Sequence, residues 1–305
     1  MTHRKHAGEI DEYELDDGYC LQRADNQEFT KYWVVYRKLN EDFAQSFAET
    51  RQELEGVPFC FWIMRAEVRI GGVVIMPNGI GDFFLIPPAD DAKRVLSTIM
   101  PLLEDWSDVT KPIRAQAVPS QYIESFKAIG WNLEESRFWM IRPTEKSNID
   151  FPVEWSLQPM ARNKIDEIAS LLTNAFSGGV GQYGARDFAA HRASVEQYFE
   201  NFDEETVCGR ASVLVVENAT GRLAGVCMVD MHKNIPAIRL VAVEPDYQHQ
   251  GIAKRLIYGV LNTLESQYDW VKLAVTIDNP AVTLYRKLGF ISGDELSQLS
   301  KPVGK

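Results

Sequence analysis

The chain has 305 residues, 45% of them hydrophobic and 25% charged, and a formal net charge of −11. This composition is typical of a folded globular protein, and the length allows two domains of about 150 residues each. The negative charge argues against nucleic acid as the main ligand, because phosphate backbones require a basic protein face. It is compatible with an amine substrate.

Neither a membrane segment nor a disulfide framework is predicted. No apolar run approaches the ~20 residues that a membrane span needs. The basic residues of the first twelve positions are not followed by an apolar segment, so no secretory signal is expected. The four cysteines lack a paired spacing. We therefore predict reduced thiols, no metal and a cytoplasmic location.

The first half of the chain is predicted to be rich in strands, with a helix after its third strong apolar run. Gly and Pro residues separate the apolar segments. The expected elements are a strand at 18–23, helical material up to about Leu54, strands at 59–64, 73–76 and 82–87, a helix from Ala92, and a late strand at 132–142.

A polar segment at 143–150, followed by Pro152, is the best candidate for a linker. The second half then repeats the same types of element. They are a strand at 153–157, a helix with its apolar side at 165–176, a glycine-rich segment at 177–184, and strands at 211–217 and 223–231 around the hairpin turn 218–221.

The most informative segment runs from Leu240 to Leu264. Residues 240–243 form an apolar run that Pro245 ends, and apolar residues then recur at helical spacing from Ile252 onward. The first turn of a helix offers unpaired N–H groups and the positive end of the helix dipole, which together bind anions. Small residues at Gly251 and Ala253 would let a phosphate approach the backbone closely.

The loop before this helix resembles the acetyl-coenzyme A signature of the GCN5-related N-acetyltransferase (GNAT) family, Gln/Arg-x-x-Gly-x-Gly/Ala. Here the motif is Gln248-His249-Gln250-Gly251-Ile252-Ala253. The resemblance implies that these six residues hold the pyrophosphate of acetyl-CoA. It also implies that the backbone of Val241, Ala242 and Val243 meets the pantetheine arm, with one N–H acting as oxyanion donor.

A second motif, Asn279-Pro-Ala-Val-Thr-Leu-Tyr285, begins 26 residues after Ala253. It is similar to the family segment in which an Asn contacts the cofactor and a Tyr faces its sulfur. The family usually places this Asn seven residues before the Tyr, whereas Asn279 lies six before Tyr285 and Asp278 occupies the expected place. Which of the two residues takes the Asn role stays open.

The fold implied by this resemblance is α/β (α+β), with two tandem GNAT-like domains. Each would contain a mixed, mostly antiparallel central sheet flanked by helices. We place a degenerate domain at 1–145, with a structural or substrate-cleft role, and a catalytic acetyl-CoA-binding domain at 146–305. Only fifteen residues follow Phe290, where the family normally adds two closing strands. The sheet edge is therefore either completed by the first domain or left short.

The two halves share short sequence similarities at similar spacing. Pro87 and Gly130 are separated by 43 residues, and Pro245 and Gly289 by 44. Such a repeat indicates duplication. The first half lacks three residues where the pyrophosphate loop belongs, and it carries Phe126 at the place of Tyr285. We therefore predict that it binds no acetyl-CoA.

Tyr285 is the candidate partner of the leaving thiolate. Full proton transfer from a tyrosine to a thiolate is uphill by about 1.5 pKa units, or ~2 kcal/mol. We therefore expect a hydrogen bond to the developing thiolate, with complete protonation favoured by a lowered pKa of Tyr285 in the site. A half-buried aromatic residue of a helix is the simpler alternative.

The attacking amine must lose a proton, because an alkyl ammonium with a pKa near 10.4 is protonated at pH 7. Asp230, His232 and Glu244, near strand ends, are the candidate bases. The sequence does not decide among them. The glycine-rich segment 177–184, with Tyr183 and Arg186, lies where the family places a mobile substrate loop, although a plain connector is equally consistent.

The resemblance favours an N-acetyltransferase that transfers an acetyl group from acetyl-CoA to a primary amine by direct attack in a ternary complex. The amine would belong to a small molecule, a peptide or a protein. No nucleic acid or membrane partner is expected, and a homodimer is left open. The alternatives are a non-catalytic acyl-CoA sensor or assembly module, and transfer of a different acyl group on the same scaffold.

Overall fold

A computed structural model describes residues 11–33, 52, 56–147, 151–179, 184 and 186–302 of the chain. The chain divides into two compact units, one made of Met1–Arg137 with Gly293–Lys305 and the other of Phe138–Ser292. This division differs from the expected one at 145/146 in two ways, because its internal boundary lies at 137/138 and the C-terminal segment belongs to the first unit.

The first unit is built on a sheet with the strand order β1-β2-β3-β4-β5-β6-β14-β7. Neighbouring strands are antiparallel except β5 and β6, which are parallel. Its elements are β1 (Glu12–Glu14), the 3-10 turn η1 (Asp16–Gly18), β2 (Tyr19–Arg23), α1 (Asn26–Trp33), β3 (Cys60–Arg65), β4 (Val68–Met76), β5 (Gly79–Leu85), α3 (Ala92–Trp106), β6 (Ile113–Pro119), α4 (Ser120–Lys127), the first part of β7 (Asn132–Pro143) and β14 (Leu296–Lys301).

Two hydrophobic clusters cover the two faces of this sheet. The apolar side of α3, which includes Val95, Leu96 and Ile99, packs with α4 against one face. On the other face, Phe29 and Trp33 of α1 pack on strand residues. The helical spacing of the apolar residues in α3 is the pattern that predicted this helix.

The second unit has the strand order β7-β12-β11-β10-β9-β8, with the short strand β13 paired to β7. Strands β11 and β12 are parallel, whereas β8, β9, β10 and β11 pair antiparallel in turn. Its elements are the rest of β7, β8 (Trp155–Pro159), the 3-10 turn η4 (Arg162–Lys164), α5 (Ile165–Phe176), α6 (Phe188–Glu200), α7 (Val207–Ala211), β9 (Val213–Glu217), β10 (Leu223–His232), β11 (Ile235–Val243), the 3-10 turn η5 (Pro245–Tyr247), α8 (Ile252–Leu264), β12 (Trp270–Thr276), α9 (Ala281–Lys287) and β13 (Ile291–Ser292).

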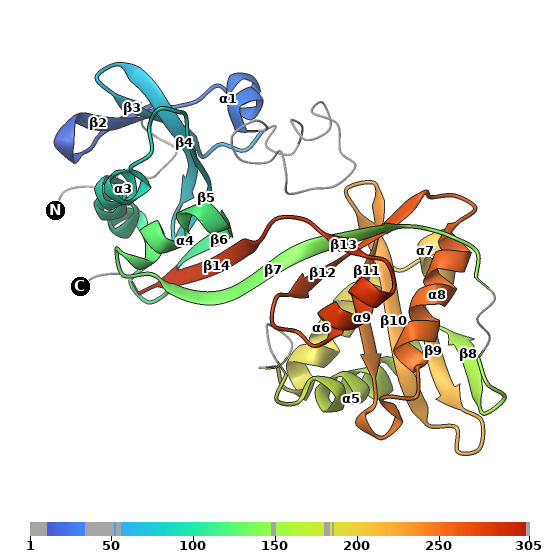
Figure 1. Cartoon of the computed structure of the whole chain (residues 1–305). Helices are drawn as coiled ribbons and strands as arrows, with labels where there is room; N and C mark the ends of the chain where they lie inside the picture. Colours follow the sequence, from blue (N-terminus) through green and yellow to red (C-terminus); the bar gives the residue numbers. More distant parts are fainter. Residues whose placement is uncertain are drawn as a thin grey trace. The chain divides into compact units, whose positions relative to one another are not determined.

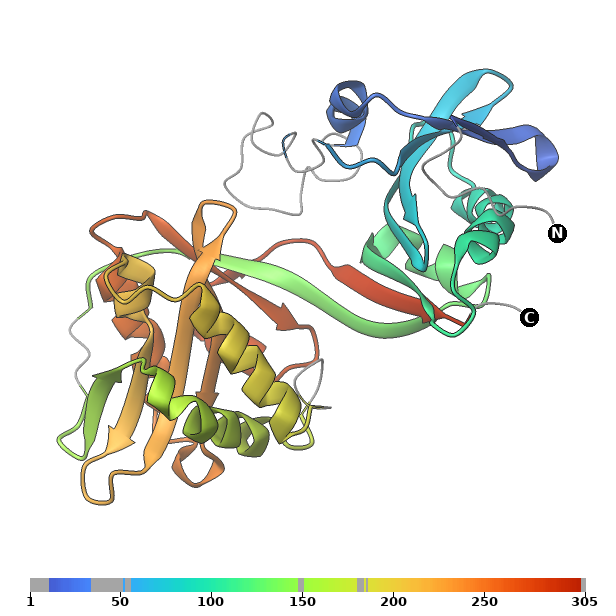
Figure 2. The same ribbon diagram turned by 180° about the vertical axis from the view of Figure 1, so that it is seen from behind.

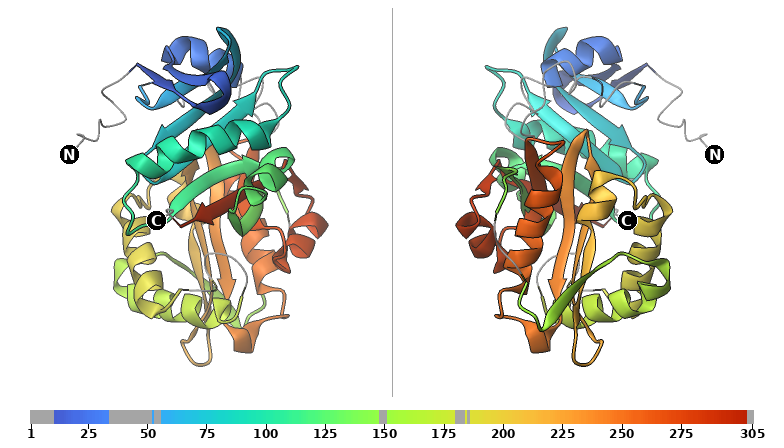
Figure 3. Two further views of the ribbon diagram at one scale, coloured as in Figure 1. Left: turned by 90° about the vertical axis from the view of Figure 1, so that its left-hand side faces the viewer. Right: turned by 90° about the vertical axis from the view of Figure 1, so that its right-hand side faces the viewer.

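Helices cover both faces of this second sheet. Figure 1 shows α8 and α9 in front of the strands, and Figure 2, seen from behind, shows α5 and α6 in front. The side views of Figure 3 show the strands between these two helical layers. Each layer closes its own hydrophobic cluster, because side chains alternate between the two faces of a strand.

The predicted duplication is confirmed by the strand register. The parallel pairs Ala237↔Lys272 and Ile238↔Leu273 join β11 to β12. The pairs Gly79↔Arg114 and Ile80↔Ala115 join β5 to β6. All four residues of one set lie 158 positions after their counterparts (237 − 79, 272 − 114). The order strand, strand, helix, strand, helix is thus repeated, with α8 and α9 matching α3 and α4.

The sheet edge of the second unit is completed by a strand from the expected first domain, rather than left short. In the second unit, β7 lies next to β12, the place where the chain itself supplies only the two-residue β13 after α9. In the first unit, β14 pairs with β6 on one side and with Asn132–Arg137 of β7 on the other. The predicted linker begins inside β7, which extends to Pro143.

Some expectations fall on residues outside the described part of the chain. These are most of the helical material between Trp33 and Leu54, residues 148–150 of the predicted linker, and residues 180–183 and 185 of the glycine-rich segment.

Leu299 of β14 is fully buried in the hydrophobic cluster of the first unit. We expect Leu299→Ala to lower the free energy of unfolding by about 2–5 kcal/mol, the usual cost of emptying a buried leucine site. Chemical denaturation followed by tryptophan fluorescence measures this change. Leu133→Ala, in the neighbouring strand but exposed, is the control and should change stability little. Equal stability of the two variants would place β14 outside the core.

Candidate functional site

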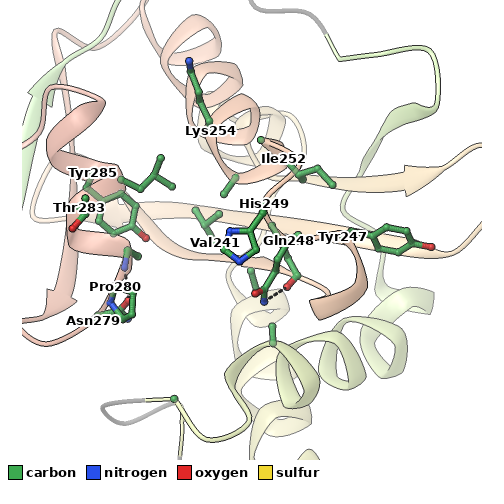
Figure 4. Close-up of a pocket in the computed structure, with 18 of the residues that line it drawn as sticks. Val241, Tyr247, Gln248, His249, Ile252, Lys254, Asn279, Pro280, Thr283 and Tyr285 are labelled. Carbon is green, nitrogen blue, oxygen red and sulfur yellow. Dashed lines mark hydrogen bonds between the residues drawn. The ribbon is translucent and has the colours of Figure 1, made fainter.

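A cavity of about 690 Å³ opens in the second unit between the ends of β11, α8 and α9, and it is bordered by the end of α5. Ten of the predicted site residues line it (Figure 4). They are Val241, Ala242, Val243, Gln248, His249, Gly251, Ile252, Ala253, Asn279 and Tyr285. Gln250 is not among the lining residues, and its side chain donates to Asp246 O instead.

The cavity exists because β11 separates from β12. The pairing between these strands ends at Ile238↔Leu273. At the same point the register with β10 passes from Val229↔Ile238 to Met228↔Leu240, so Arg239 is an extra residue of β11. Such a bulge bends the strand that carries it. The last residues of β11 therefore line an opening rather than a strand pair.

The backbone of β11 presents polar groups to this opening. Glu244 N–H donates to Ala224 O at 2.9 Å, which makes residues 244 and 224 a hydrogen-bonded pair. In an antiparallel ladder these pairs alternate with pairs that are not hydrogen-bonded. The N–H groups of Val241 and Val243 therefore point away from β10. In agreement, Gln248 Nε2 donates to Val243 O at 3.1 Å from the cavity side (Figure 4). Of the three predicted backbone positions, Ala242 is the one directed to β10.

The N-terminus of α8 is open to the cavity. Gly251 is its N-cap, with φ +79° and no side-chain hydrogen bond to the first turn. The first N–H groups of the helix are therefore available to an anion. Glycine suits this position, because a residue with a side chain disfavours the left-handed backbone. His249 also has a positive φ of 61° and lies at the centre of the cavity lining (Figure 4).

The charged side chains of the described cavity lining are positive, whereas the net charge of the whole chain is negative. The described lining includes Lys254 and Lys287 but no Asp or Glu, although the chain carries a net charge of −11. Lys254 follows Ala253 in the first turn of α8, and Lys287 ends α9. The Lys254 ammonium lies 5.9 Å from the ring centroid of Tyr258, further along α8, so the positive group that an anion meets at the loop is the N-terminus of α8.

Tyr285 faces the cavity from α9 (Figure 4). Its ring packs edge-on against Phe290, with 6.0 Å between ring centroids. Burial, and to a smaller extent the neighbouring Cys227, raises the pKa of Tyr285. The expected lowering of this pKa is therefore wrong, because the apolar surroundings disfavour the phenolate. The hydroxyl stays protonated at neutral pH, so it can donate a hydrogen bond to a ligand.

The structure separates Asn279 from Asp278. Asn279 lines the cavity, and its Oδ1 accepts from Ala281 N–H at 2.9 Å at the start of α9. Asp278 is exposed and does not belong to the described lining. Of these two residues, Asn279 is therefore the one at the described cavity.

The three candidate bases lie outside the cavity lining. His232 stacks on Trp139 and pairs with Ile235, which is six residues, or about 20 Å of extended strand, from Val241. Asp230 pairs with Ala237, about 13 Å from Val241 by the same measure. Burial raises the pKa of Asp230, although Arg239, 3.2 Å away, opposes this shift. Glu244 accepts a hydrogen bond from Asn174 at 2.9 Å.

Several lining residues were not predicted. Lys254, Thr283 and Lys287 lie one or two positions from Ala253 and Tyr285, and only their closeness in sequence to the two motifs could have identified them. Ala175, Phe176 and Gly179 come from the end of α5, and only the tertiary fold brings them to the cavity. Gly179 belongs to the predicted substrate loop, whereas Tyr183 lies outside the described residues.

The matching place in the first unit is closed. Its cavity between β5, β6 and α4 measures about 10 Å³. Phe83 fills it, in edge contact with Tyr122 at 5.0 Å and with Phe126 at 6.4 Å between ring centroids. Leu85 N–H, the counterpart of Val243 N–H, donates to the Tyr122 hydroxyl at 3.1 Å. Asp91 caps the first turn of α3, so its carboxylate occupies the position of an anion.

Within the described part of the chain, no group of three or more His, Cys, Asp or Glu residues is arranged to hold a metal ion. Among the same residues, no helix is long and apolar enough to cross a membrane.

Residues 179–298 match the family model described as "Acetyltransferase (GNAT) domain". Two curated relatives are named mycothiol acetyltransferase. The protein of Clavibacter sepedonicus is 32% identical over 111 residues, which cover 35% of this chain and 36% of the relative. That of Thermobifida fusca is 26% identical over 172 residues, which cover 50% of this chain and 53% of the relative. The matches thus span about a third to a half of these relatives.

Two solved structures share the fold over almost the whole chain. A GCN5-related N-acetyltransferase from Sphaerobacter thermophilus superposes with a TM-score of 0.65 at 12% identity, covering 96% of this chain and 98% of that protein. A tandem GNAT protein from the clavulanic acid biosynthesis pathway superposes with a TM-score of 0.54 at 14% identity, covering 96% and 99%.

Gly251→Gln tests the role of the α8 N-terminus. A side chain at φ +79° is strained by about 1–2 kcal/mol, and this one would also obstruct the approach of an anion to the helix. We expect the affinity for coenzyme A, measured by calorimetry, to fall at least about tenfold, or ~1.4 kcal/mol. The matched control is Gly259→Gln in the same helix, where open space surrounds the new side chain. Unchanged affinity in Gly251→Gln would refute the loop assignment.

Proposed function

We propose that the protein transfers an acetyl group from acetyl-CoA to a primary amine by direct attack in a ternary complex, since residues 179–298 match a GNAT acetyltransferase domain model. The main observation in support of this proposal is that three features lie at one cavity. These are the open N-terminus of α8, the unpaired edge of β11 and the protonated hydroxyl of Tyr285.

Each feature serves one part of the cofactor. The N-terminal N–H groups of α8 would bind the phosphates. Val243 N–H would hold the pantetheine arm alongside β11. Val241 N–H would stabilise the negative charge that develops on the thioester oxygen, as a preorganised oxyanion donor.

The amine nitrogen attacks the thioester carbon, and the C–S bond breaks as the tetrahedral intermediate collapses. Tyr285 then donates a hydrogen bond to the leaving thiolate. The proton of the amine leaves through water to Asp230, since its raised pKa makes this carboxylate a stronger base than an exposed one. No direct contact between Asp230 and the amine is required.

The acceptor is proposed only by class, as a primary amine of a small molecule, peptide or protein. The relatives' name, mycothiol acetyltransferase, describes those proteins, and the matched segments cover 36% and 53% of their lengths. Mass spectrometry of the purified protein for bound coenzyme A tests the cofactor. A screen of amines with acetyl-CoA and thiol detection tests the reaction, and the absence of turnover with any amine would favour an acyl-CoA sensor.

We expect one coenzyme A per chain, bound by the second unit, because aromatic side chains fill the matching place in the first. Calorimetry should give a stoichiometry of one for the wild type. Asp91→Asn, at the capped helix of the first unit, should leave affinity and stoichiometry unchanged, because Asn retains the cap. A stoichiometry of two would contradict the assignment.

Tyr285→Phe should reduce turnover while leaving cofactor affinity and stability nearly unchanged. The ring and its contact with Phe290 remain, and one hydroxyl is lost. Loss of one donor to a developing anion costs roughly 2.7–4 kcal/mol, or about 10²–10³ in turnover. Steady-state kinetics with the best amine of the screen measures the effect. Undiminished turnover, with chemistry rate-limiting, would rule out Tyr285 as the partner of the thiolate.

A further inference from the structure

Arg142 of β7 is a buried arginine that contacts the helix carrying Tyr285. Its side chain is 7% exposed. One guanidinium nitrogen donates to Leu288 O, a second donates to the carboxylate of Glu145, and Nε donates to Pro143 O at 3.0 Å. A buried charge is tolerated only where such partners compensate its loss of water.

Leu288 O belongs to the C-terminal end of α9. This helix has only seven residues, and Leu288 is its C-cap, followed by Gly289 with φ +85°. The last carbonyl groups of a helix have no partner within the helix and carry the negative end of its dipole. The Arg142 guanidinium supplies both a hydrogen bond and a positive charge there.

Arg142 also lies against the aromatic pair at the site. Its guanidinium carbon lies 5.9 Å from the ring centroid of Phe290. Phe290 in turn packs edge-on against Tyr285. Arg142 thus holds α9 at its C-terminal end through Leu288 and holds the ring beside Tyr285 through Phe290, but it does not line the cavity.

We propose that Arg142 is the positioning residue of Tyr285, fixing α9 so that the hydroxyl meets the leaving thiolate. The inference rests on the proposed acetyl transfer, and it concerns the rate of the reaction rather than cofactor binding. A short helix without this anchor would let the hydroxyl shift, and misplacement by about 1 Å can cost up to about a hundredfold in rate.

The test combines Arg142→Met and Arg142→Lys with Tyr285→Phe in a double-mutant cycle. We expect Arg142→Met to lower kcat by roughly ten- to a hundredfold with little change in KM for acetyl-CoA. In the Tyr285→Phe background the same change should have no further effect, because the hydroxyl to be positioned is already absent. Arg142→Lys should recover part of kcat, since one ammonium replaces a planar fork of donors.

Arg192→Met is the matched control, because Arg192 lies in the same unit but forms exposed ion pairs with Asp166 and Glu196. It should leave kcat unchanged. Equal loss of kcat on adding Arg142→Met to wild type and to Tyr285→Phe would overturn the proposal, because a general structural defect acts in both backgrounds.

Hydrogen exchange gives a second measurement that needs no amine. Arg142→Met should speed exchange of the amides of residues 285–289 at least about tenfold, whereas Arg192→Met should not. Unchanged exchange at α9 would overturn the inference even if acetyl transfer is confirmed. Faster exchange without turnover of any amine by the wild type would instead contradict the proposed function and, with it, the catalytic role of this anchor.

Discussion

The separation of β11 from β12 is the constraint on which the rest of the site depends. Two adjacent parallel strands normally satisfy each other's backbone groups along their length. Here one extra residue, Arg239, bends β11 away just after its last pair with β12. Polar backbone groups of Val241 and Val243 are thereby exposed in a water-accessible cavity, next to a helix whose first turn is uncapped. Without this bulge, β11 and β12 would stay paired at this place and leave no room for a ligand.

The first unit shows that this opening can be closed by side chains alone. Its strand β5 also carries an extra residue, at Asp82 and Phe83, just after its last pair with β6. Yet the space is occupied by an aromatic group of Phe83, Tyr122 and Phe126, and Tyr122 satisfies a backbone N–H that would otherwise face the cavity. The two halves therefore share one backbone arrangement, but side chains fill the opening in the first half and leave it open in the second. Buried aromatic rings stabilise the first, whereas the second leaves polar groups free for binding.

Much of this arrangement could be predicted from the sequence, because the signals are local. The apolar spacing from Ile252 to Leu264 indicated α8, and the small residues at Gly251 and Ala253 indicated a close approach to the backbone at its start. Other elements lack such signals. The strand β12 contains the buried Lys272 within its apolar run, and the buried side of α6 includes the polar His191. A polar residue at a buried position obscures the apolar pattern of each element.

The path of the C-terminus could not be predicted for a different reason. Whether the last strand pairs with its own half or with the other half depends on contacts between residues far apart in the chain. Leu299 of β14 pairs with Ala115 and Leu133, more than 160 positions away. The same limit applies to Tyr285. Its position on α9 followed from the motif, but the direction of its pKa shift depends on the apolar residues that bury it.

The placement of β14 has a consequence for the order of folding during synthesis. The ribosome completes α3, β6 and α4 long before it adds the last strand, so the sheet of the first unit lacks the strand between β6 and β7 for most of translation. A nascent chain in this state exposes two strand edges, which are prone to wrong pairings. By contrast, Phe138–Pro143 of β7, which pairs within the second unit, is synthesised before the other strands of that unit. The second half of the chain can therefore assemble its sheet first, and the half that is synthesised first is the one that finishes last.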